Sequence, residues 1–173
     1  QRDDKIRLVW IGSTGTLEYL DQIRPVLERI GRHFSNVCLR IICDSFLEFK
    51  NIKTEKCIWS EATQYSDLAQ CDIGLAPLAD NKFTRGKCGF KVLQYFAASL
   101  PCVGSGVGVN SKFIQNGLTG FQAAAEQDWF DRLSLLITDA QLRKKMGAAA
   151  KEYAEDYDLK VIGAKLAKLI NCI

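Results

Sequence analysis

The sequence predicts an α/β domain in which helices cover both faces of a parallel sheet. Two observations support this prediction: short apolar segments alternate with segments of helical periodicity, and the apolar segments are continuous rather than alternating. The length of 173 residues suits one domain, and no repeat or low-complexity linker divides the chain. We therefore expect a single doubly wound domain over residues 1–173, with helices alone from residue 126 onward.

Strands are expected where apolar and β-branched residues gather. The expected strands are residues 5–12, 37–43, 56–59, 72–76 and 100–103, and a short edge strand that follows a turn within 117–121. Helical spacing of apolar residues is found in residues 17–30, 61–70, 90–99, 110–116 and 126–171, with a loop over 81–89. Pro25 should kink or split the first helix. The expected N-caps are Thr16, Asn110, Asp139 and Asp158.

The composition excludes several classes of protein. Apolar residues make up 47% and charged residues 25%, which does not fit a disordered chain, a collagen or a coiled coil. No apolar run reaches the roughly 18 residues that span a bilayer, and the polar N-terminus has no signal-peptide core. Because the chain does not begin with Met, we expect it to be a piece of a longer one. Seven cysteines without a CxxC motif, and one histidine, predict buried reduced thiols in a cytoplasmic protein, with no metal site and no resident cofactor.

The basic charge is confined to one segment. The net charge is only +3, but residues 81–125 contain no Asp or Glu and five basic residues. Arg85, Lys87 and Lys91 lie within seven residues of one another. Lys91 should fall in the first turn of a helix, where the dipole disfavours a cation unless an anion compensates it. We expect these three side chains to hold a diphosphate, and the alternative is a solvated basic loop. Nucleic-acid binding has thin support, because only Phe83 and Phe90 flank the charges.

Ligands of open α/β sheets bind outside the carboxyl ends of the strands, so the loops at those ends are candidates for a site. There are three candidate loops. The first contains Gly12, Ser13, Thr14 and Gly15, the second is the basic loop over residues 80–89, and the third contains Gly104, Ser105, Gly106 and Val107. The first and the third are each either a plain connection or a backbone that can approach an anion. Trp59 follows the third strand and either packs in the core or stacks on a base. Asp80 is either a turn residue or an acceptor for a ligand hydroxyl. His33 should be exposed at a helix C-terminus.

The basic segment and its neighbours carry a resemblance to a known family. The segments 72–78 (DIGLAPL), 85–104 (RGKCGFKVLQYFAASLPCVG) and 116–121 (NGLTGF) resemble the donor-binding half of group 1 glycosyltransferases, glycosyltransferase family 4. The resemblance covers nearly the whole chain. It implies a Rossmann-like domain that is the C-terminal half of a GT-B enzyme, in which the active site lies between two such domains.

The resemblance also implies roles for single residues. Two family glutamates, eight positions apart, fall on Gly86 and Gln94, so both carboxylates are absent. The amide oxygen of Gln94 can still accept from ribose hydroxyls, whereas Gly86 cannot contact the donor sugar with a side chain. Lys91 matches a family variant with a lysine three residues before the second glutamate. The implied donor-binding residues are therefore Gly12, Ser13, Thr14, Gly15, Trp59, Gly86, Phe90, Gln94, Gly104, Ser105, Gly106 and Val107, with Arg85, Lys87 and Lys91 acting on the diphosphate.

The implied activity is glycosyl transfer with retention from a nucleotide sugar, without a metal ion. An acceptor-binding domain should precede Gln1, so the chain alone should bind donor weakly and transfer nothing. The resemblance leaves room for peripheral membrane association of the full-length enzyme. The alternative is a non-catalytic Rossmann-like module that uses the basic loop 82–91 to bind a phosphorylated ligand or a protein partner.

Overall fold

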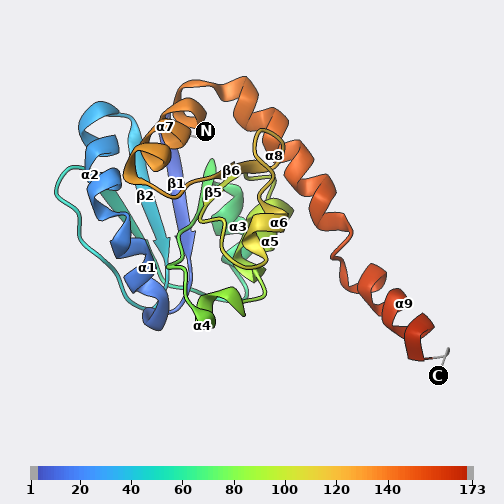
Figure 1. The fold of residues 1–173 in the computed structure, drawn as a ribbon. Helices are drawn as coiled ribbons and strands as arrows, with labels where there is room; N and C mark the ends of the chain where they lie inside the picture. Colours follow the sequence, from blue (N-terminus) through green and yellow to red (C-terminus); the bar gives the residue numbers. More distant parts are fainter. Residues whose placement is uncertain (1–3, 171–173) are drawn as a thin grey trace.

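The computed structural model describes residues 4–170, which form a fully parallel sheet of six strands (Figure 1). The strands are β1 Ile6–Ile11, β2 Val37–Ile42, β3 Lys53–Cys57, β4 Ile73–Ala76, β5 Cys102–Gly104 and β6 Gly120–Gln122. Their order across the sheet is β3-β2-β1-β4-β5-β6, and every pair in register is parallel. This is the Rossmann order, in which the chain changes direction across the sheet between β1 and β4. The predicted doubly wound fold is confirmed.

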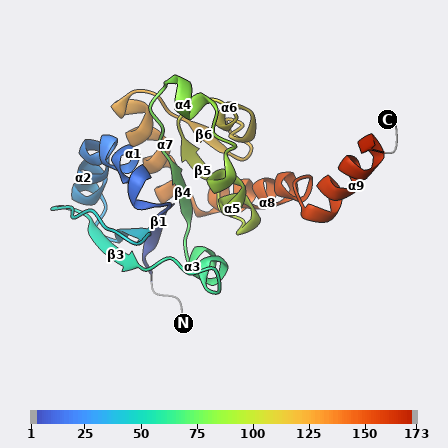
Figure 2. The same ribbon diagram turned by 90° about the horizontal axis from the view of Figure 1, so that it is seen from below.

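Helices cover both faces of the sheet (Figure 2). The helices are α1 Leu17–Gln22, α2 Arg24–His33, α3 Gln64–Ala69, α4 Lys82–Arg85, α5 Phe90–Ala97, α6 Asn110–Phe113, α7 Glu126–Thr138, α8 Ala140–Glu155 and α9 Leu159–Ile170. One buried core joins the sheet to α1, α2 and α7, and a second joins it to α3, α5, α6 and α8. The apolar strands are buried on both faces for this reason, which is why they read as continuous apolar runs.

The strands β1 and β4 separate at the point where the sheet changes direction. They are paired only at Leu8 with Ile73 and at Val9 with Gly74. Beyond these pairs, the buried hydroxyl of Tyr95 accepts from the backbone N–H of Ile11 at 3.1 Å and donates to the carbonyl of Leu75 at 2.9 Å. The phenol therefore bridges the two parting strands, and it fixes α5 against their carboxyl ends.

Most predicted boundaries hold, and the differences have local causes. Pro25 splits the first helix as expected and occupies the first turn of α2, where its missing N–H costs nothing. Asp139 caps α8 by accepting from the N–H of Leu142 at 2.8 Å. The third strand lies earlier than predicted, because an edge strand paired only with β2 tolerates the polar residues of 53–57. His33 is exposed at the end of α2, as predicted.

Two predictions of local structure in the basic segment are wrong. The expected loop 81–89 contains α4, because Asn81 and Thr84 each accept a hydrogen bond from the other's backbone N–H. Asn110 is the first residue of α6 and not its cap. Thr16 occupies the N-cap position of α1, as predicted, although its hydroxyl donates to the carbonyl of Ser13 rather than accepting from a helical N–H.

The last helix, α9, extends away from the rest of the molecule (Figure 1). None of its described residues is buried, and Leu159 is 88% exposed. Within residues 4–170, no helix combines the length and the apolar character that crossing a membrane requires.

Candidate functional site

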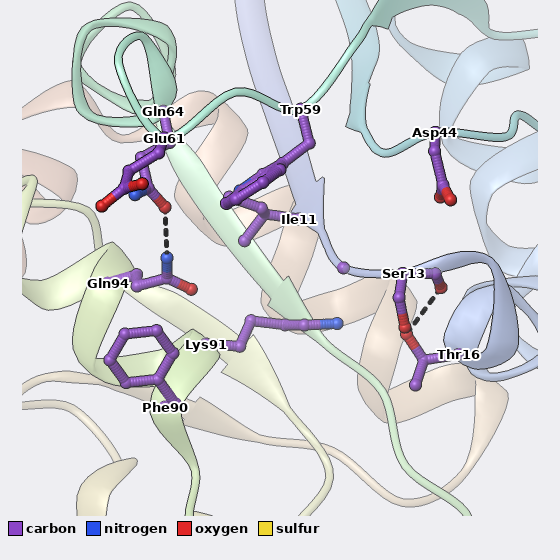
Figure 3. A pocket seen from close by; sticks show the side chains of 11 residues that line it. Ile11, Ser13, Thr16, Asp44, Trp59, Glu61, Gln64, Phe90, Lys91 and Gln94 are labelled. Carbon is purple, nitrogen blue, oxygen red and sulfur yellow. Dashed lines mark hydrogen bonds between the residues drawn. The ribbon is translucent and has the colours of Figure 1, made fainter.

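A cavity of about 660 Å³ opens at the carboxyl ends of β1 and β2, beside the point where β1 and β4 separate. We call it the first cavity. It is lined by Ile11, Gly12, Ser13, Thr16, Asp44, Trp59, Glu61, Gln64, Phe90, Lys91 and Gln94. Figure 3 shows Lys91 extending across it, between an end that carries Gln64 and Gln94 and an end that carries Ser13 and Thr16. The fold thus places a cation in the crevice where ligands of doubly wound sheets bind.

Lys91 is held in the first turn of α5, as predicted. Its amine lies 3.9 Å from the centroid of the buried Trp10 ring, a cation–π contact. Burial lowers the pKa of Lys91 to about 7, and the nearby charge of Lys87 acts in the same direction. No carboxylate of residues 4–170 forms an ion pair with this amine. An anionic ligand beside Lys91 would stabilise its charged form.

The start of α5 needs a glycine. Gly89 precedes the helix with a φ of +69°, and a Cβ there would lie 2.7 Å from Cγ1 of Val109 and 2.8 Å from Cε2 of Phe113. The first N–H groups of the helix have no partner within it, and they lie at its positive end. Lys91 and these N–H groups therefore attract an anion to the same place.

Two amides define one end of the first cavity. Nε2 of Gln94 donates to Oε1 of Gln64 at 2.9 Å, which leaves Oε1 of Gln94 as an acceptor. Glu61 lines the same end (Figure 3). This end can accept hydrogen bonds from neighbouring hydroxyls, although the expected family glutamate is replaced by Gln94.

The opposite end is built from the first loop and from Asp44. The hydroxyl of Thr14 donates to Oδ1 of Asp44 at 2.8 Å, and this bond is the main reason that the pKa of Asp44 is lowered. A Cβ on Gly12 would lie 2.5 Å from Cη2 of Trp10, so the loop can follow this path only with glycine. Gly12 and Ser13 line the cavity, whereas Thr14 acts through Asp44 and Gly15 faces open space.

Two aromatic side chains line the first cavity and face solvent. Trp59 is 48% exposed and Phe90 is 61% exposed. The core-packing interpretation of Trp59 is therefore wrong. Exposed aromatic faces at a cavity are suited to stacking on a planar group.

A second cavity, of about 450 Å³, shares Thr16, Phe90 and Lys91 with the first. Its other lining residues are Tyr19, Ala76, Pro77, Leu78, Gly86, Lys87, Cys88, Gly89, Val92 and Asn110. The two cavities therefore adjoin at Lys91. A ligand that contacts this lysine can occupy both.

The structure brings only part of the predicted site together. Lys87, Lys91 and Gly86 line the two cavities. Arg85 lines neither of them, and its exposed guanidinium binds both carboxylate oxygens of Asp80, at 2.6 and 3.0 Å.

The third candidate loop also lies elsewhere. Ser105, Gly106 and Val107 line a separate hollow of about 500 Å³ together with Asp80 and Asp128, and Gly104 is buried at the end of β5. The cause is the position of β5, which lies one strand further from the crevice than β4.

Sequence reasoning missed several lining residues. Asp44 comes two residues after the end of β2, so the rule that points to strand ends could have found it. Gln64, Glu61 and Asn110 carry no such signal, because their positions depend on how α3 and α6 pack. Among residues 4–170, no cluster of His, Cys, Asp and Glu could hold a metal ion.

Of the six cysteines that the structure describes, all are free and four are buried. Cys57 is partly exposed and Cys88 is exposed. Cys172 lies outside the described residues.

Solved structures share this fold. HepE from Anabaena, in complex with UDP and glucose, matches 98% of this chain over 49% of its own length, with a TM-score of 0.76 and 14% identity. TarM from S. aureus, in a G117R mutant complex with UDP, fondaparinux and α-GlcNAc-glycerol, matches 96% of this chain over 36% of its own, with a TM-score of 0.74 and 16% identity. The C-terminal domain of the group 1 glycosyl transferase LpcC from Francisella tularensis matches 89% of this chain over 87% of its own, with a TM-score of 0.69 and 15% identity.

The chain therefore has the fold of the C-terminal domain of a GT-B glycosyltransferase. Residues 2–139 match the family "Glycosyl transferases group 1", and the chain belongs to that family. It spans between a third and a half of the length of TarM and HepE. No curated protein sequence matches it significantly.

Proposed function

We propose that this chain binds the nucleotide-sugar donor of a glycosyltransferase, with the nucleoside diphosphate in the first cavity and the sugar in the second. The observation that carries the proposal is Lys91, a partly buried ammonium without a carboxylate partner in the described residues, where the two cavities adjoin. A diphosphate at that point supplies the missing counter-charge, and it connects a nucleoside on one side with a sugar on the other.

The other lining groups suit the rest of a nucleoside. Oε1 of Gln94 and the carboxylate of Glu61 can accept from the ribose hydroxyls, and Trp59 offers an exposed face to the base. The related HepE and TarM structures hold UDP, which supports a diphosphate ligand here.

During transfer, the bond between the anomeric carbon and the diphosphate oxygen breaks, and negative charge develops on the departing diphosphate. Lys91 and the N–H groups at the start of α5 would stabilise that charge, which lowers the barrier. Retention, independence of metal ions and a cytoplasmic location remain parts of the proposal that follow from the family. The acceptor site would lie on a domain that precedes this one, so residues 1–173 alone are expected to bind donor without transferring sugar.

The alternative of a protein-binding module receives less support. Lys87 and Lys91 line cavities rather than project from the surface, and this placement favours a small anionic ligand. Within the basic loop 82–91, the side chains of Phe83 and Arg85 do face outward, and they are 70% and 63% exposed.

The test is a calorimetric titration of the chain with UDP and with GDP. We expect one of them to bind, and Lys91→Met to weaken that binding by about 30-fold, because a buried charge-assisted contact is lost. Lys112→Met is the matched control, since Lys112 is exposed on α6 and lines neither cavity. Absence of binding by both nucleotides, or equal binding by Lys91→Met and the wild type, would overturn the proposal.

A further inference from the structure

The second cavity is unusual in its charge. Its described lining residues include two lysines, Lys87 and Lys91, and no Asp or Glu. The first cavity, by contrast, contains Asp44 and Glu61, and the separate hollow that contains Asp80 and Asp128 shares only Leu78 with the second cavity. The ring hydroxyls of a neutral sugar commonly donate hydrogen bonds to carboxylates. The described lining of this cavity contains no carboxylate that could accept them.

Lys87 has no anionic partner within residues 4–170. Its ammonium lies 4.7 Å from the centroid of the Phe83 ring and 5.6 Å from that of Tyr19. Both rings hold the cation by its attraction to their faces, and neither neutralises it. Tyr19 also lines the second cavity, so the contact places the ammonium at the wall that Tyr19 forms.

Asn110 provides a second and independent observation. It is only 3% exposed, it lines the second cavity, and its side chain makes no hydrogen bond to any described residue. Because its amide atoms are not fully buried, they open to the cavity, where water or a polar atom of a ligand can bind them. The remaining walls are largely apolar, with Pro77, Leu78 and Val92 among them.

We propose that the sugar of the donor carries a carboxylate, as a uronic acid does, and that Lys87 binds this carboxylate while Asn110 binds a neighbouring sugar oxygen. The proposal rests on the proposed function, because the diphosphate at Lys91 is what directs the sugar into the second cavity. A sugar carboxylate supplies an anionic partner for the ammonium of Lys87. A neutral sugar leaves that ammonium without a counter-charge.

The experiment compares UDP, UDP-glucose and UDP-glucuronic acid on the same chain, because the two sugars differ only at C6. If GDP is the nucleotide that binds, GDP-mannose and GDP-mannuronic acid replace them. We expect the uronic acid to bind about 10-fold more tightly than the neutral sugar, the effect of one hydrogen bond to a charged group. Lys87→Met should abolish that preference. Because Lys87 also lowers the pKa of Lys91, the affinity for UDP is measured alongside, and it should change less than the affinity for UDP-glucuronic acid.

Introducing a negative charge at nearly constant side-chain shape gives a second readout. Asn110→Asp should weaken the binding of UDP-glucuronic acid more than that of UDP-glucose, because it places a second negative charge beside the sugar carboxylate. Lys112→Met again serves as the control. Equal affinity of the wild type for the two sugars would overturn this inference alone. So would an equal loss of UDP and UDP-glucuronic acid in Lys87→Met, which would make Lys87 a diphosphate ligand. Failure of every nucleotide to bind overturns the proposed function, and this inference with it.

Discussion

The two cavities adjoin at Lys91 but differ in how their polar groups are held. In the first cavity, Thr14 fixes Asp44 and Gln64 fixes Gln94. In the second, no described residue forms a hydrogen bond or ion pair with the side chains of Lys87 and Asn110. Side chains that are already fixed suit a part of the ligand that is common to many donors. Side chains without partners make affinity depend on what the ligand itself supplies, and they therefore favour discrimination.

The largest expected effect is on the free energy of unfolding of the protein without ligand, because the charged form of Lys91, which lines both cavities, is disfavoured by its surroundings. The pKa of Lys91 is lowered to about 7, mainly by burial, whereas in the unfolded chain it is near 10.5. The unfolded chain therefore holds more protons between these values, and wild-type stability should rise with pH across that window. Between pH 7 and pH 9, we expect the wild type to gain roughly 2 kcal/mol relative to Lys91→Met, about 5 °C in midpoint. Thermal unfolding of the two proteins without ligand measures this difference, and parallel pH profiles would contradict it.

The second prediction concerns ligand binding at the same lysine. A bound diphosphate stabilises the protonated amine, so it raises the pKa of Lys91 in the complex. Affinity for UDP should thus be greatest below pH 7 and should fall by up to about 10-fold per pH unit above it. Calorimetry between pH 6.5 and pH 8.5 tests this slope. Lys91→Arg is the control, because a guanidinium stays charged and should give a flatter profile. A wild-type profile as flat as that of the arginine variant would count against the assignment.

The third prediction separates the base from the diphosphate within the first cavity. Trp59→Ala should weaken UDP by about 5-fold, because a stacking face is lost, and should leave pyrophosphate binding unchanged. Tyr65→Ala is the matched control, since Tyr65 is also exposed and lines neither cavity. Equal effects on UDP and pyrophosphate would show that Trp59 acts through the shape of the loop rather than on the base.

The smallest effect is expected at Arg85. Its guanidinium is bound to Asp80 at the surface and lines neither cavity. Arg85→Ala should change the affinity for UDP by less than about twofold, because exposed ion pairs contribute little and are screened by salt. A loss of UDP affinity as large as that of Lys91→Met would show instead that Arg85 binds the diphosphate. Its ion pair with Asp80 would then have to open when UDP binds.

Sequence reasoning could predict the topology because buried parallel strands and amphipathic helices leave separate patterns. Gly12 and Trp59 could be predicted as site residues because they follow the carboxyl ends of strands. Lys91 could be predicted because it belongs to a cluster of basic residues at such an end. Sequence reasoning could not predict which way a side chain turns within a loop. Arg85 is drawn to Asp80 because the cap at Asn81 starts an unexpected helical turn.

The missed residues show the other limit of the sequence. Asn110 reaches the second cavity because α6 packs beside α5, which is a property of tertiary packing. Gln64 meets Gln94 although the two lie 30 positions apart in the chain. No local pattern records either contact.

The contact between Lys91 and Trp10 places a natural fluorophore beside the site. The indole of Trp10 is buried, and the amine lies 3.9 Å from its centroid, so its excited state experiences the charge of that amine directly. Trp129 is buried in the core on the α7 face, and Trp59 is open to solvent. The three indoles thus lie in different surroundings, and we expect emission from Trp10 to respond to the protonation of Lys91 and to a ligand bound beside it. The protein carries an intrinsic fluorescent reporter at the junction of its two cavities.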